Sequence, residues 1–128
     1  MGDSISVYVV DGDDAVLDSL NALLMQEGFA VKLFSSADSL LEALNTDRAA
    51  ESGFACVLLD LHLPGKGGRD LLEILAERDR RIPMIVMTGN TSNKARERAL
   101  SAGALAFLEQ PVDAEILIDA IKRCHQTE

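Results

Sequence analysis

Acidic and hydroxyl side chains stand at the ends of several apolar runs in this sequence of 128 residues. The run 54–59 leads directly into Asp60, and an acidic loop at 11–14 follows the first apolar run. Another run, 84–87, is followed by Thr88. Carboxylate oxygens suit a hard cation such as Mg²⁺, which keeps some of its waters for a phosphate. These residue types therefore indicate divalent-metal and phosphate chemistry.

Five short apolar runs rich in β-branched residues predict five strands. They cover residues 5–10, 29–34, 54–59, 84–87 and 105–108. Between them, apolar residues recur at helical spacing, which predicts helices. The expected helices run from Asp13 or Asp14 to Gly28, from Ser35-Ser36 through Leu44, over 70–81, over 92–102, and from Pro111 onward with Ile116, Leu117, Ala120 and Ile121 facing inward.

Alternation of strand and helix predicts an α/β fold, a doubly wound parallel sheet with helices on both faces and right-handed crossovers. The carboxyl ends of parallel strands meet at one edge, where open α/β sheets place their chemistry. The acidic loop, Asp60, Thr88 and Gln110 should therefore be neighbours. In the helix over 92–102, the inward residues are Ala95, Ala99 and Leu100, so it should be loosely held.

Composition narrows the class of protein. With 48% apolar and 26% charged residues, 1–128 should form a single globular domain, and the net charge of −9 argues against direct nucleic-acid binding. No apolar run approaches the ~20 residues that span a bilayer, and no leader is evident at the N-terminus. Because Cys56 and Cys124 are the only cysteines, a disulfide framework is not expected. We expect a cytoplasmic protein without a membrane partner.

Each of these residues also has a possible structural role that involves no chemistry. An aspartate at a strand end, such as Asp60, is often a turn or cap residue, and Thr88 can cap the helix that follows it. Phe107 can be an ordinary core aromatic, and the aspartates of the loop 11–14 can simply favour a helix N-terminus. Only the combination of these residues at one edge of the sheet favours metal and phosphate chemistry over purely structural roles.

That combination resembles a known family. An acidic loop after the first strand, Leu-Leu-Asp-Leu-His-Leu-Pro-Gly around Asp60, Met-Thr-Gly around Thr88 and Phe-Leu-Glu-Gln-Pro at 107–111 occur in the order found in receiver domains of two-component response regulators. The resemblance covers about 6–124. It implies a flavodoxin-like (βα)5 fold with strand order 2-1-3-4-5, and a signalling module that is not an enzyme in the ordinary sense.

The resemblance also implies roles for residues. Asp60 would accept a phosphoryl group from a histidine kinase, a phosphotransfer protein or a small phosphodonor. Asp11 and Asp60, with the backbone carbonyl of His62, would hold Mg²⁺. Thr88 would move to hydrogen-bond the phosphate, and Phe107 would swing inward with it. An added phosphoryl charge that recruits a hydroxyl is also reasonable on physical grounds.

Two positions depart from the family pattern. Gly12 stands where the family has a second acid that binds the metal, so Mg²⁺ binding should be weak. Gln110 replaces the lysine that pairs with the phosphate and lacks its charge. Both changes weaken charge neutralisation, on which phosphoryl transfer depends. The residues available to compensate are Asp13 and Asp14 for the metal, and Lys66 and Arg69 for the charge.

Three classes of function remain open at this point. The first is a phosphorylatable switch, and the second is a pseudo-receiver that binds partners without phosphate. The third is an enzyme on the same architecture, which fits least because a haloacid-dehalogenase-like phosphatase needs an aspartate where His62 stands. For a switch, we expect the helix over 92–102, the strand 105–108 and the last helix to form the face for a homodimer, a partner or an output domain.

Overall fold

Five parallel strands form one sheet in the order β2-β1-β3-β4-β5, as expected from the sequence. The computed structural model describes residues 5–46, 55–60, 71, 73–75, 77, 82–89 and 92–126. The strands are β1 (Ser6–Val10), β2 (Ala30–Phe34), β3 (Ala55–Asp60), β4 (Met84–Thr88) and β5 (Ala106–Glu109). β3 is buried along its whole length in the middle of the sheet, and its last residue, Asp60, pairs with Met87 of β4.

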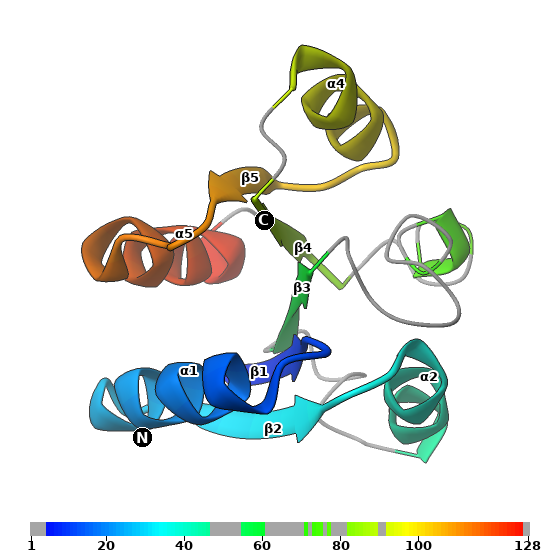
Figure 1. Cartoon of the computed structure of the whole chain (residues 1–128). Coiled ribbons are helices and arrows are strands. Elements are labelled where there is room, and N and C mark those ends of the chain that lie inside the picture. Colours follow the sequence, from blue (N-terminus) through cyan, green and yellow to red (C-terminus); the bar gives the residue numbers. More distant parts are fainter. Residues whose placement is uncertain are drawn as a thin grey trace.

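Helices cover both faces of this sheet. They are α1 (Asp14–Gln26), α2 (Ala37–Thr46), α4 (Asn93–Ser101) and α5 (Ala114–Gln126). Figure 1 shows α1 and α5 on one side of the sheet and α2 on the other. In the helix predicted over 70–81, residues 71, 73–75 and 77 are helical, and the remainder lies outside the described residues. The flavodoxin-like fold class is confirmed.

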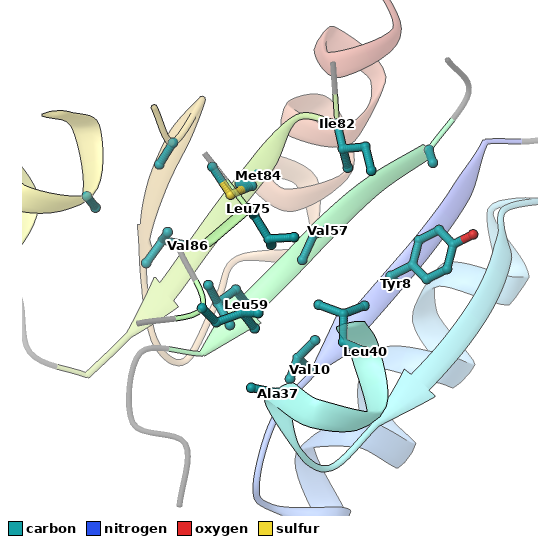
Figure 2. Close-up of a cluster of buried hydrophobic side chains, with 14 residues drawn as sticks. Tyr8, Val10, Ala37, Leu40, Val57, Leu59, Leu75, Ile82, Met84 and Val86 are labelled. Carbon is teal, nitrogen blue, oxygen red and sulfur yellow. The ribbon is translucent and has the colours of Figure 1, made fainter. Parts of the chain in front are cut away.

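The alternation of side chains along each strand divides the core into two clusters. Figure 2 shows the cluster on the α2 side, where Val57 and Leu59 of β3 meet Leu75 and Val86. On the other face, alternate residues of the same strands pack against α1 and α5. The central members of this second cluster are Val7, Val9, Leu17, Leu20, Leu24, Cys56, Leu58, Ile85, Met87, Leu117, Ala120, Ile121 and Cys124.

Local capping fixes where the helices begin and end. The Asp13 carboxylate accepts the N–H of Ala15 at 2.9 Å and starts α1. Gly28, with φ +90°, follows the end of α1, in a conformation that favours glycine. The Ser92 hydroxyl accepts the N–H of Ala95 at 3.2 Å and starts α4. These signals explain why the predicted helix boundaries agree with the structure.

Two predicted core residues are instead exposed. Leu100 of α4 is 42% exposed and Ile116 of α5 is 52% exposed. Each stands one residue, or about 100° around the helix, from a buried neighbour, Ala99 or Leu117. The predictions that Leu100 and Ile116 face the core are therefore wrong. In the part of the chain that the structure describes, no helix is both long enough and apolar enough to cross a bilayer.

Candidate functional site

Strand register brings two carboxylates together at the carboxyl edge of the sheet. Val10 of β1 pairs with Leu59 of β3, so Asp11 and Asp60 follow on adjacent strands. Their side chains are nearly buried, with exposed fractions of 1% and 8%. Buried carboxylates need a compensating partner. Their proximity, which the sequence predicted only through the topology, makes this edge the strongest candidate site.

The next strands add a hydroxyl and an amide to the same edge. Asp60 pairs with Met87, so Thr88 is the following residue on β4, and its side chain is fully buried. The backbone N–H of Gln110 donates to the carbonyl of Thr88 at 3.0 Å, which places Gln110 directly after β5. The structure thus brings together the four expected positions that lie at the ends of β1, β3, β4 and β5.

The two oxygens of Asp11 are in different situations. Oδ1 accepts the backbone N–H of Asp13 at 2.9 Å. Oδ2 is buried and has no hydrogen-bond partner within the described ranges of the chain. A buried carboxylate oxygen without a partner is costly, and a bound cation is one way to offset that cost. Nothing in the sequence distinguishes these two oxygens, so this feature became visible only in the structure.

The electrostatics of Asp11 agree with this geometry. Burial is the main cause that raises the pKa of Asp11, and the hydrogen bond from the Asp13 N–H opposes it. The neighbouring charge of Asp60 raises this pKa further, whereas the nearby Gln110 amide lowers it slightly. The amide does not reach hydrogen-bonding geometry with Oδ2, which has no such partner. Among the described residues of the site, the neighbouring carboxylates of Asp11, Asp13 and Asp60 would favour a cation.

The described side chains at this edge are of the kind that Mg²⁺ prefers as ligands, but they are too few to complete a metal site. Asp11 and Asp60 supply carboxylate oxygens, the ligands that Mg²⁺ prefers. Gly12 is exposed and has no side chain, while Asp13 is exposed and uses one oxygen to cap α1. Over the described ranges, no three His, Cys, Asp or Glu side chains are grouped to hold a metal. The predicted residues His62, Lys66 and Arg69 lie outside these ranges.

Phe107 occupies the middle of β5, where it pairs with Val86 of β4. Its side chain is half-buried and packs against the cluster on the α2 side, to which Ala99 of α4 also belongs. Phe107 is therefore located between the strand that carries Thr88 and the helix α4. This position allows it to couple β4, which carries Thr88, to α4.

Replacing Asp11 with asparagine is expected to stabilise the metal-free protein at neutral pH. Because the folded state raises the pKa of Asp11, the ionised carboxylate opposes folding above that pKa. Asp11→Asn should therefore raise the free energy of unfolding by about 1 kcal/mol, equivalent to roughly 3–5 °C in melting temperature. The gain should shrink as the pH falls through the raised pKa towards 3.8, the ordinary value.

Thermal unfolding in chelator at several pH values measures this effect. Asp119→Asn is the matched control, because Asp119 is exposed on α5 and should change the melting temperature little. A lower melting temperature for Asp11→Asn than for the wild type at pH 7 would contradict this account. It would show that other groups offset the cost of burying the Asp11 carboxylate, although Oδ2 has no hydrogen-bond partner among the described residues.

Comparison with known proteins gives matches over nearly the whole chain. The family model of the response regulator receiver domain matches residues 7–122. Transcriptional regulatory protein FixJ of Bradyrhizobium diazoefficiens is 36% identical over 116 residues, which are 91% of this chain and 54% of that protein. Response regulator protein TodT of Pseudomonas putida F1 is 35% identical over 123 residues, or 95% of this chain and 52% of that protein. The chain thus spans about half the length of these relatives.

Solved structures agree with this result. The crystal structure of FixJ-N superposes with a TM-score of 0.85 and 33% identity, covering 100% of this chain and 98% of that one. A CheY-like receiver domain protein from Methanospirillum hungatei gives a TM-score of 0.86 and 29% identity, covering 97% and 95%. The matches in sequence and in structure point to the same family.

Proposed function

The chain belongs to the response regulator receiver domain family, and from this premise we propose that it is a signalling switch whose Asp60 accepts a phosphoryl group. The donor is a histidine kinase or a phosphotransfer protein. The observation that supports this most directly is the buried pair of Asp11 and Asp60 at the carboxyl edge, with Asp11 Oδ2 lacking a partner. Such a pair is suited to hold a cation beside a phosphoryl acceptor.

In the proposed transfer, a carboxylate oxygen of Asp60 attacks the phosphorus atom. The bond between phosphorus and the imidazole nitrogen of the donor breaks, and this nitrogen keeps the electron pair. When bound, Mg²⁺ neutralises negative charge on the phosphoryl oxygens. Asp11 and Asp60 would hold the ion, and the family resemblance adds the backbone carbonyl of His62, which lies outside the described residues. The chain itself contributes position and orientation, since β1 and β3 fix both carboxylates in register.

We propose that this transfer is slower and needs more Mg²⁺ than in a receiver with the full set of charges. Gly12 offers no carboxylate, and Asp13 is engaged as the cap of α1. Gln110 can donate a hydrogen bond to a phosphoryl oxygen but brings no positive charge. Both differences reduce the electrostatic stabilisation on which phosphoryl transfer depends.

Phosphorylation of Asp60 would then act on α4 through Thr88 and Phe107. The phosphoryl group adds charge and acceptor oxygens, which favour movement of the buried Thr88 hydroxyl toward it. Phe107, which is half-buried beside this strand, would move inward. Only Ala95 and Ala99 are buried within α4, so few apolar contacts hold this helix in place.

The face that receives this change consists of α4, β5 and α5, and is called here the α4–β5–α5 face. It carries charges of both signs, which suits contact with a second copy or with a partner. Leu100 and Leu105 add exposed apolar surface to this face. The exposure of Leu100 was not expected from the sequence. The exposed charged residues of this face include Lys94, Arg96, Glu97 and Arg98 of α4, and Asp119, Lys122 and Arg123 of α5.

Phosphodonor should make the wild-type protein self-associate through this face. Sedimentation velocity with and without the donor measures the association, and the double variant Arg96→Glu, Lys122→Glu should remain monomeric in both conditions. Lys32→Glu is the control, because Lys32 is exposed on β2 at the opposite edge of the sheet. This control should behave like the wild type. Monomers in every sample would reject self-association and leave docking of a different protein as the use of this face.

A second function is favoured by Gly12 and Gln110. Both changes remove charge from the groups that promote phosphoryl transfer, as expected in a pseudo-receiver that binds partners without phosphate. In that case the wild type should self-associate equally well without a donor, and the double variant should not. The same sedimentation experiment therefore distinguishes the two functions.

An output domain is a natural partner of such a switch. FixJ is a transcriptional regulatory protein and TodT a response regulator protein, and each is about twice as long as the region that matches this chain. We propose that this chain likewise controls an output domain or a separate partner. With its net charge of −9, the chain itself is not expected to bind nucleic acid.

A further inference from the structure

The only two cysteines of the sequence meet in the core, 68 positions apart in the chain. Cys56 is the second residue of β3, and Cys124 lies near the end of α5. Both are buried in the cluster on the α1 and α5 side, and neither forms a disulfide. The two thiols are near enough for each to be the largest influence on the pKa of the other. This contact is unrelated to the carboxylate site and has no role in the proposed phosphoryl transfer.

The environments of the two thiols differ. The hydrogen bond with Cys56, followed by the charge of Arg123, lowers the pKa of Cys124, although burial opposes this effect. The same hydrogen bond and complete burial raise the pKa of Cys56 well above its usual range. Cys124 is also slightly exposed, at 7%, whereas Cys56 is not exposed at all. Cys124 is therefore the thiol that an oxidant from solvent reaches first, and its lowered pKa favours the thiolate there.

We propose that Cys56 and Cys124 are a peroxide-sensitive dithiol, which oxidises to an intramolecular disulfide linking β3 to α5. The proposal rests on the burial of both cysteines in one cluster, where α5 packs on the face of β3 that carries Cys56, and the proximity of the two thiols supports it. It is independent of the proposed phosphorylation, since Cys56 is four residues before Asp60 and near the opposite end of β3. A small neutral oxidant such as hydrogen peroxide suits a sulfur with so little exposed surface.

The chemistry takes place in two balanced steps. The Cys124 thiolate attacks one oxygen of hydrogen peroxide, the O–O bond breaks, and hydroxide leaves, so that Cys124 becomes a sulfenic acid. The sulfur of Cys56 then attacks the Cys124 sulfur, the S–O bond breaks, and the leaving hydroxide takes up the Cys56 proton and departs as water. After the hydroxide has taken up a proton, two thiols and one peroxide have given one disulfide and two waters.

Oxidation would also displace α5. The sulfur atoms must approach to about 2.05 Å, which is closer than a hydrogen-bonded thiol pair. Because β3 is the central strand, α5 is the element expected to move. Its first turn follows Gln110 and Pro111, so this movement would be felt at the loop after β5. Oxidation would thus be a second signal, besides phosphorylation, that changes the α4–β5–α5 face.

Treatment of the folded chain with hydrogen peroxide tests the proposal, using intact mass and peptide mapping without reductant. The wild type should lose the mass of two hydrogen atoms, remain a monomer, and give a linked peptide pair that contains Cys56 and Cys124. A reductant should reverse the change. In Cys56→Ala, Cys124 should gain one oxygen that dimedone traps, because the second thiol is absent. In Cys124→Ala, Cys56 should react at least about tenfold more slowly than the wild type.

Several results would overturn the proposal. The first is a wild type that keeps both thiols while glutathione in the same solution is oxidised. The second is a disulfide between two chains, and the third is equal reactivity of Cys56 in Cys124→Ala. Circular dichroism verifies that each variant is folded. The linked peptide pair from the wild type decides the matter even where a variant does not fold.

Discussion

Asp60→Asn is expected to abolish phosphoryl incorporation from a small acyl phosphate. The carboxylate of Asp60 is the proposed nucleophile, and the amide that replaces it has nearly the same shape but reacts poorly with phosphorus. Loss of a nucleophile typically costs on the order of 10³-fold or more in rate. Asp60 is buried at the end of the central strand, whereas the adjacent Asp11 already uses Oδ1 to accept the backbone N–H of Asp13. Intact mass after treatment measures the added group.

The matched control for this prediction is Asp13→Asn. Asp13 is also an aspartate at this edge, but it is exposed and caps α1. Its asparagine variant should still be phosphorylated, with a modest change in stability because asparagine is also a good cap. A full-strength phosphoryl signal in Asp60→Asn would remove Asp60 from the proposed role and direct attention to another carboxylate.

Gly12→Asp is expected to increase the affinity for Mg²⁺ by at least about tenfold. Gly12 directly follows Asp11, whose Oδ2 is buried without a partner, and it is exposed, so a side chain can be accommodated. An added carboxylate would complete a set of three with Asp11 and Asp60, and hard cations bind more tightly as the number of charged ligands rises. Calorimetric titration of both proteins with Mg²⁺ measures the difference.

Gly12→Asn separates charge from shape in this experiment. Asparagine has nearly the size of aspartate and offers an oxygen, but no negative charge. It should improve Mg²⁺ binding much less than aspartate does. Equal affinities for the wild type and Gly12→Asp would mean that another group, such as Asp13, already completes the site of the wild-type protein.

Much of the fold was predictable because local signals agree with the topology. Asp13 and Ser92 cap the helices that their positions predicted, and the apolar runs became strands of one parallel sheet. The edge shared by Asp60 and Thr88 then followed from the parallel arrangement alone. Leu100 was placed wrongly because α4 has few apolar residues, and the small Ala95 and Ala99 define its inner face instead.

Other features depend on three-dimensional packing and had no counterpart in the sequence. The unpartnered Oδ2 of Asp11 depends on how its carboxylate is turned, and Oδ1 takes the available N–H of Asp13. The contact of Cys56 with Cys124 requires α5 to pack on the face of β3 that Cys56 occupies. The prediction of a strand shows which of its side chains share a face of the sheet, but not which helix covers that face.

The central claim is that Asp60 accepts a phosphoryl group in a reaction that Mg²⁺ supports. Intact mass of the wild-type protein, treated with an acyl phosphate in a series of Mg²⁺ concentrations and in chelator, tests it most directly. We expect one added phosphoryl group, with incorporation that rises across the series and is minimal in chelator. No added mass at any Mg²⁺ concentration, or equal incorporation with chelator, would contradict the account.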